Sequence, residues 1–131
     1  MNIWSLGHAQ ATLFIIAIMK SVIKIKENRD FRRAYAKGKA LVCPYAVVYV
    51  LKNRCDNIRL GITTGKKIGN AVKRNRAKRV IRAAFMPLVP FIKEGYDFVI
   101  VARTRLLTVK STAVSDSIRG LLEAVEICEK R

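Results

Sequence analysis

The segment "KKIGNAVKRNRAKRVIRAAF" (66–85) restricts the local structure more than any other part of the chain. Its apolar residues recur at the spacing i, i+3, i+4 and i+7, which places them on one side of an α-helix: Ala77, Val80, Ile81 and Ala84. Gly69 interrupts the chain, Asn70 can cap a first turn, and Pro87 cannot continue a helix. The segment therefore predicts an amphipathic helix that begins after Asn70 and ends before Pro87.

The opposite side of this predicted helix is almost entirely cationic. Arg74, Lys78 and Arg82 fall at i, i+4 and i+8. The same polar side also carries Asn75, Arg76 and Arg79. The segment contains no acidic residue, so the helix cannot neutralise its own charge. Because guanidinium groups bind phosphate oxygens in bidentate fashion, the pattern favours a polyanionic ligand.

The charge of the whole chain supports the same interpretation. Its 131 residues include 26 Lys and Arg against 9 Asp and Glu, which gives a formal net charge of +17. Nucleic acid is the polyanion that best relieves such a charge; an anionic membrane surface and a solvated basic face are weaker alternatives. The apolar side of the helix is small and aliphatic, unlike that of a membrane-surface helix. A DNA-reading helix would need base-reading side chains where this one has mainly cations.

Two more helices are predicted, one near each end of the main sequence. Asn28 can cap the first, and Gly38 can end it in a left-handed conformation. Ser111 or Thr112 can cap the last. Its apolar stripe consists of Val114, Ile118, Leu121, Leu122 and Val125.

Three predicted strands complete the pattern. Residues 40–51 are rich in Val, Tyr and Leu, with Pro44 forcing an edge or a bulge near the start. Residues 58–63 alternate at strand period, and the turn formers between these two segments predict a β-hairpin. Residues 96–102 are apolar enough to be buried on both faces, so this strand is expected to be central. The order αββαβα predicts an α/β sandwich, a small mixed sheet packed by helices.

The chain is long enough for one domain, predicted over residues 20–131, and residues 1–19 form an N-terminal extension. The apolar run 11–19 is shorter than the roughly 20 residues that span a bilayer. Lys20 follows this run, whereas the positive charge of a secretory signal precedes it. Met19 can equally be the initiator, so the extension is either disordered or a mis-assigned start.

No catalytic or metal-binding constellation is predicted in the chain. Cys43, Cys55 and Cys128 are odd in number and widely spaced, which predicts reduced, half-buried thiols. His8, the sole histidine, lies in the extension without a neighbouring ligand. Asp97 beside a strand is the one acid that suggests chemistry, and a surface or capping role is predicted for it.

Phe31, Tyr35 and Tyr49 have two possible roles. Aromatic residues at helical or strand spacing more often belong to a core. Cations surround the first predicted helix, however: Arg29, Arg32, Arg33, Lys37 and Lys39. Aromatic rings among cations form a stacking groove for single-stranded nucleic acid. Val47 lies on the same predicted strand face as Tyr49 and joins this candidate surface.

Four segments together resemble the bacterial ribonuclease P protein subunit. The most specific is "GKKIGNAVKRNRAKRVIRAAF" (65–85), and the others are "ENRDFRRAYAKG" (27–38), "IRLGIT" (58–63) and "YDFVIVAR" (96–103). The resemblance implies a domain similar to the second domain of a ribosomal small-subunit protein, with a left-handed β-α-β crossover. General rules alone would predict a right-handed connection, which holds in roughly 98% of cases.

The resemblance also implies which residues act. The expected contacts to the catalytic RNA are Lys66, Lys67, Asn70, Arg74, Asn75, Arg76, Lys78, Arg79 and Arg82. The expected cleft for the 5′ leader of precursor tRNA consists of Phe31, Arg32, Tyr35, Val47 and Tyr49.

The implied activity is the magnesium-dependent endonucleolytic removal of that leader, catalysed by the RNA subunit and its Mg²⁺ ions. This chain would be a non-catalytic protein cofactor, cytoplasmic, without a membrane partner and present once per catalytic RNA. An RNA-binding module such as a ribosomal protein fits the composition equally well, and only the match at 65–85 distinguishes the two.

Overall fold

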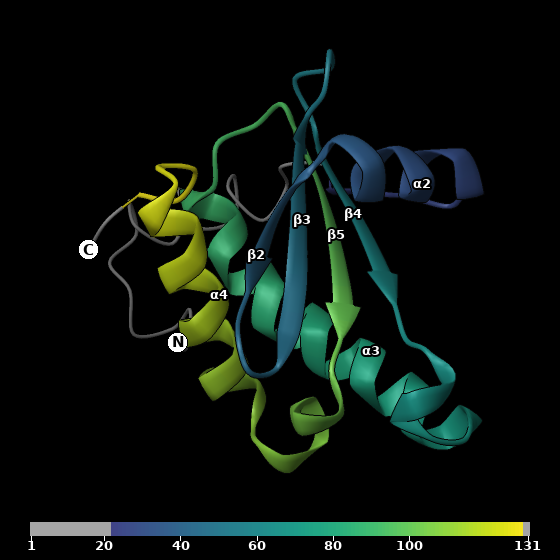
Figure 1. The fold of residues 1–131 in the computed structure, drawn as a ribbon. Coiled ribbons are helices and arrows are strands. Elements are labelled where there is room, and N and C mark those ends of the chain that lie inside the picture. Colours follow the sequence, from purple (N-terminus) through teal and green to yellow (C-terminus); the bar gives the residue numbers. More distant parts are fainter. Residues whose placement is uncertain (1–21, 130–131) are drawn as a thin grey trace.

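The computed structural model describes residues 22–129, which form one five-stranded sheet with helices on both faces (Figure 1). The elements are β1 (Val22–Lys24), α2 (Asn28–Lys37), β2 (Lys39–Val42), β3 (Ala46–Lys52), β4 (Ile58–Thr63), α3 (Ala71–Phe85), β5 (Tyr96–Ala102) and α4 (Ser111–Ala124). Short 3₁₀ segments, η2 (Lys66–Ile68), η3 (Met86–Phe91) and η4 (Thr104–Thr108), connect them. The predicted extension over residues 1–19, with His8, lies outside the described residues.

The sheet is mixed, with the strand order β1-β4-β5-β3-β2. Strands β1, β4 and β5 are parallel, whereas β3 is antiparallel to β5 and β2 is antiparallel to β3. The central position of β5 confirms the prediction, since Phe98, Val99 and Ile100 are fully buried. These features confirm the predicted fold class, a small mixed sheet packed by helices.

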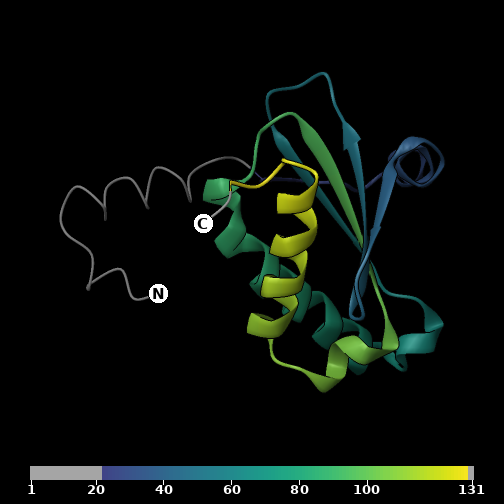
Figure 2. The same ribbon diagram turned by 60° about the vertical axis from the view of Figure 1, so that its left-hand side comes forward.

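The helices are divided unequally between the two faces of the sheet. Helices α3 and α4 cover one face and α2 lies on the other, as the two views in Figures 1 and 2 show. In Figure 1, β4 runs down the page, α3 returns behind the sheet, and β5 lies to the left of β4. The β4-α3-β5 crossover between these parallel strands is therefore left-handed, as the resemblance implied and against the general rule.

The main core lies between the sheet and helices α3 and α4. The predicted stripes supply it: Ala77, Ile81 and Ala84 of α3 are fully buried, while Val80 is only half-buried. Phe85 at the end of α3 packs on Phe98 of β5 with ring centroids 5.4 Å apart. On α4 the buried stripe residues are Val114, Ile118 and Leu122, with Leu121 and Val125 packed beside them. Burial of the larger of these side chains, at roughly 1.5–3 kcal/mol each, holds α3 and α4 in this core.

The predicted hairpin between residues 40–51 and 58–63 is wrong. Strand β3 pairs with β2 and β5, and β4 lies on the far side of β5. Asn53 N–H donates to the Gly95 carbonyl (2.8 Å), and Gly95 N–H donates to the Asn57 carbonyl (3.2 Å). The start of β5 is thus inserted between the two arms of the turn, because burying this apolar strand on both faces outweighs local pairing.

Two further strand assignments differ from the prediction. Residues 40–51 form two strands, because Pro44 lies in the turn that separates β2 from β3. Cys43 N–H donates to the Ala46 carbonyl (3.0 Å) and closes this turn. The short edge strand β1 pairs in parallel with β4 and was not predicted, since three residues carry too little pattern.

Of the four predicted helix caps, two at the ends of α2 and one at the start of each of α3 and α4, only the cap of α3 is confirmed. The side chain of Asn70 accepts the N–H of Lys73 (3.0 Å), as predicted. Asn28 is the first residue of α2 rather than its cap, and Lys110 rather than Ser111 or Thr112 precedes α4. Neither of these two helix starts has a side-chain cap.

Gly38 ends α2 in an extended conformation (φ −74°), not in the predicted left-handed one. A close approach explains the glycine instead, since a Cβ there would lie 2.4 Å from the Ala34 carbonyl oxygen.

We expect Gly38→Ala to lower the free energy of unfolding by about 1–3 kcal/mol, because backbone must move to admit the methyl group. Urea unfolding followed by circular dichroism measures the change. Gly120→Ala on the exposed side of α4 is the matched control. A Cβ there meets no atom within 4 Å, so we expect this variant to gain about 0.4–1 kcal/mol. Equal effects of the two substitutions on the free energy of unfolding would show that the close approach to Ala34 does not explain the glycine at position 38.

The three cysteines are free thiols. Cys43 and Cys128 are buried and Cys55 is exposed, so the prediction of half-buried side chains is wrong for each. Burial raises the pKa of the Cys128 thiol, although the nearby Arg119 opposes the shift. Because the thiolate is the reactive form, Cys128 is an inert core side chain.

Candidate nucleic-acid interface

The cations of α3 lie on a surface without counter-charge. Arg76, Lys78, Arg79 and Arg82 are exposed and Arg74 is half-buried. The ion pairs among the described side chains join Arg29 to Glu27, Arg119 to Glu123, and Arg33 and Arg59 to two aspartates. None of these ion pairs includes a cation of α3. The helix therefore keeps its positive charge available for a ligand.

This charge occupies two flanks of α3 rather than the single predicted stripe. On the flank towards β1 and β4, Lys78 and Arg82 line a hollow of about 260 Å³ together with Lys24. On the flank towards α4, Arg76 and Arg79 line a hollow of about 450 Å³ with residues 109–112.

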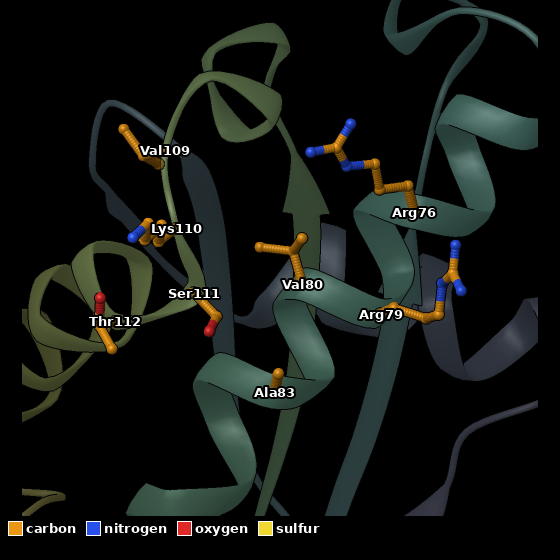
Figure 3. Close-up of a pocket in the computed structure, with 8 residues that line it drawn as sticks. All are labelled: Arg76, Arg79, Val80, Ala83, Val109, Lys110, Ser111 and Thr112. Atoms are coloured by element: carbon orange, nitrogen blue, oxygen red, sulfur yellow. The ribbon is translucent and has the colours of Figure 1, made fainter.

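Figure 3 shows this second hollow. Val80 and Ala83 line it on α3, and Val109 and Ser111 line it on the other side, with Ser111 at the start of α4. The guanidinium group of Arg76 extends to the same side of α3 as Val80, whereas that of Arg79 extends away from it. Phosphate groups can therefore approach α3 from either side. Lys110, Ser111 and Thr112 were missed from the sequence, because only the fold brings them beside α3.

The chain between β4 and α3 adds two more cations. Lys66 and Lys67 are exposed on the 3₁₀ turn η2, which buried Ile68 anchors to the core. Gly69 then adopts a positive φ of 132°, where L side chains are strained. The oxygen of Asn70 caps α3, so its amide nitrogen is the group left for a ligand. The turn thus places both lysines at the N-terminal end of the cationic helix.

The aromatic residues lie on the opposite face of the sheet, between α2 and β3. The rings of Tyr35 and Tyr49 meet edge to face with centroids 5.0 Å apart. The Tyr35 hydroxyl lies 2.9 Å from Thr63 Oγ1, and 40% of this residue is exposed. Phe31 lies directly over Gly61, where a Cβ would stand 2.7 Å from its ring. The structure therefore brings the three predicted aromatic residues together, partly buried and partly open.

The remaining predicted cleft residues border this cluster. Val47 is half-buried two residues before Tyr49 on the same face of β3, and Arg32 is exposed on α2. Val47 pairs in register with Val42, which is 57% exposed, and with Val101 of β5. Val42 and Val101 extend the open apolar surface and were missed, because strand register was not predicted.

Asp97 does not have the predicted surface or capping role. Only 1% of it is exposed, and its carboxylate accepts hydrogen bonds from Asn53 (2.8 Å) and Arg59 (3.1 Å). Arg59 also donates to Asp30 of α2 (2.9 Å). A buried carboxylate is stable here because charged and polar partners satisfy it.

These features define a class of small basic α/β proteins, with a cationic helix on one face of a mixed sheet and aromatic side chains on the other. The family model of Ribonuclease P matches residues 19–126 of the sequence. The chain therefore belongs to the ribonuclease P protein family, and as such a protein component it partners ribonuclease P RNA.

Individual relatives agree with this assignment. A ribonuclease P protein component of Clostridioides difficile (strain 630) is 38% identical over 104 residues, covering 79% of this chain and 91% of the relative. That of Pelotomaculum thermopropionicum is 38% identical over 109 residues, covering 83% and 97%.

Solved structures show the same fold. The RNase P protein of Staphylococcus aureus superposes with a TM-score of 0.72 at 34% identity, covering 83% of this chain and all of the other. That of Thermotoga maritima has a TM-score of 0.69 at 32% identity, covering 77% and 96%.

Proposed function

We propose that this chain binds ribonuclease P RNA through α3 and η2, binds the 5′ leader of precursor tRNA through the face between α2 and β3, and so assists leader removal. The observation that carries the proposal is the cationic surface of α3, whose cations take part in none of the ion pairs described above. Folded RNA supplies phosphates at the density that such a surface requires.

The two flanks of α3 suit folded RNA better than an extended strand. Guanidinium groups on both sides of one helix can reach phosphates of two RNA segments that lie on either side of it. The residues that we assign to this contact are Lys66, Lys67, Asn70, Arg74, Asn75, Arg76, Lys78, Arg79 and Arg82.

The opposite face suits a single strand. Exposed aromatic rings bind bases by stacking without strict sequence preference, as binding to many different leaders requires. Tyr35 and Tyr49 offer partly open rings, and Arg32 adds a cation beside them. Phe31 is half-buried with its ring over Gly61, so its proposed role includes supporting the other rings.

The chemistry of the reaction is assigned to the RNA. Within residues 22–129, no three side chains of His, Cys, Asp or Glu converge to form a metal site. The proposed ligands of the Mg²⁺ ions that the reaction needs are phosphates of the RNA. Within the same residues, no helix has the length and apolar character to cross a membrane. We expect one copy of the chain per RNA, in the cytoplasm.

Cleavage of precursor tRNA by the cognate RNA subunit tests the proposal. At low Mg²⁺ concentration, addition of the protein is expected to increase the rate of cleavage at the mature 5′ end, because its cations replace screening by the metal ion. Another basic protein at equal charge concentration is the control. No stimulation, or equal stimulation by the control, would reject the function.

We expect Tyr35→Ala to weaken binding of the leader by about 1–3 kcal/mol, the usual effect of removing one stacking ring. Fluorescence titration of the holoenzyme with precursor tRNAs that have long and short leaders measures this difference. Tyr35→Phe keeps the ring and loses only the hydroxyl contact to Thr63, so its affinity should stay near that of the wild type. An equal loss in both variants would assign the effect to the hydroxyl instead.

A further inference from the structure

Helix α2 is attached to the sheet by little apolar surface. The buried apolar residues on its side, within the described chain, are Ile25, Ala34 and Val99, with Phe31 and Tyr49 packed around them. The core on the other side of the sheet has 24 buried residues. Since elements with few buried contacts open and shift most easily, apolar packing alone defines the position of α2 poorly.

Charged side chains supply the missing attachment. The Asp97 carboxylate, near the start of the central strand β5 and 1% exposed, accepts a hydrogen bond from Nη1 of Arg59 at 3.1 Å. The other terminal nitrogen of Arg59, Nη2, donates to Asp30 of α2 at 2.9 Å. Arg33 of α2 approaches the same two carboxylates, at 3.5 Å from Asp30 and 3.7 Å from Asp97. Two guanidinium groups thus connect the sheet to the helix, and Arg59 makes the shorter contacts.

The geometry of this connection constrains both the distance of α2 from the sheet and the orientation of the helix. A guanidinium group is planar and rigid, and its two terminal nitrogens hold the two carboxylates at fixed positions. Asp30 immediately precedes Phe31 in the sequence. The other end of α2 is held by the contact between Tyr35 and Thr63. Of the candidate leader-binding rings on α2, Phe31 thus lies next to one attachment point and Tyr35 forms the other.

We propose that Arg59, seated by Asp97 and bound to Asp30, is a positioning residue for the leader. It holds α2 at the separation from β3 at which Tyr35 and Tyr49 present their rings together, and it does not itself contact RNA. The inference rests on the proposed leader-binding function and adds the residues that define the geometry of that surface.

The test uses the reconstituted holoenzyme and two precursor tRNAs that differ only in leader length, one nucleotide against five or more. The measured quantity is the gain in affinity that the longer leader gives. Asp30→Asn removes the negative charge that Arg59 contacts on α2 but leaves Arg59 paired with Asp97, so the chain should fold. We expect the gain to fall by about five- to tenfold, with affinity for the short-leader substrate unchanged. Amide exchange in α2 should accelerate in parallel.

A second variant and a matched control complete the design. Arg59→Lys keeps the charge, but a single ammonium group lacks the fork that spans both carboxylates, so we expect the same loss. Asp116→Asn, an exposed position on α4, makes the same change of charge on the other side of the sheet and should keep the full gain. The control corrects for the general effect of one extra positive charge on RNA binding.

Three outcomes would overturn the inference. A full leader-dependent gain in both Asp30→Asn and Arg59→Lys would show that the bridge does not position the rings. Equal loss of affinity for both substrates would assign these residues to folding or to RNA-subunit binding. If the wild-type protein gives no leader-dependent gain, the leader-binding function itself fails, and the inference fails with it.

Discussion

Asp97→Ala is expected to lower the free energy of unfolding by about 3–5 kcal/mol, the usual effect of removing one partner of a buried ion pair. The carboxylate is 1% exposed and accepts hydrogen bonds from Asn53 and Arg59. Its loss leaves the Asn53 amide without one acceptor and reduces the counter-charge around Arg59 in a half-buried position. Asp97→Asn keeps the shape of the side chain and should lower the free energy of unfolding by less.

Chemical denaturation with the RNA absent measures this effect without interference from binding. Asp56→Ala is the control, because Asp56 is exposed in the turn before β4. Substitutions at such positions normally change stability by less than about 0.5 kcal/mol. A loss below about 1 kcal/mol for Asp97→Ala would show that the sheet does not depend on this carboxylate.

The triple variant Arg74→Ala, Lys78→Ala and Arg82→Ala should lose at least about 100-fold in affinity for ribonuclease P RNA near 0.15 M salt. Each cation is expected to make one phosphate contact worth roughly 1–1.5 kcal/mol. Each lost contact also reduces the slope of log K against log salt by about 0.7–0.9. The slope should therefore become shallower by about 2–3.

Filter binding over a series of salt concentrations gives both quantities. A triple variant at Lys52, Arg54 and Lys93, all exposed and outside α3, removes the same charge and is the matched control. It should change the slope much less, because these side chains lie outside the proposed contact surface. An equal change of slope in both variants would mean that net charge, rather than the position of the cations on α3, determines binding.

The elements that were predicted correctly are those with long periodic patterns. The apolar spacing of 71–85 and 111–124 identified α3 and α4, because a helix that buries one side must repeat at 3.6 residues. The apolar run 96–102 identified the central strand, and Asn70 was recognised as a cap. The resemblance at 65–85 supplied the left-handed crossover, which no local pattern encodes.

The errors that affect the topology and the site concern interactions between distant parts of the chain. Turn formers between residues 52 and 58 predicted a hairpin, whereas β5 enters between the two strands. Asp97 was assigned to the surface because a lone acid in a sequence does not reveal Arg59, 38 residues away. Residues 109–112, which lie opposite Arg76 and Arg79, were missed for the same reason, since they approach α3 only in the folded chain.

The placement of α2 and α3 on opposite faces of one sheet has a consequence for the whole particle. The sheet acts as a spacer of constant thickness between the helix proposed to dock on the RNA subunit and the rings proposed to receive the leader. Strand β5 contributes to both sides, with Phe98 and Ile100 in the main core and Val99 behind the rings. If both contacts form as proposed, the sheet keeps a precursor on one face at a set distance from the RNA subunit on the other.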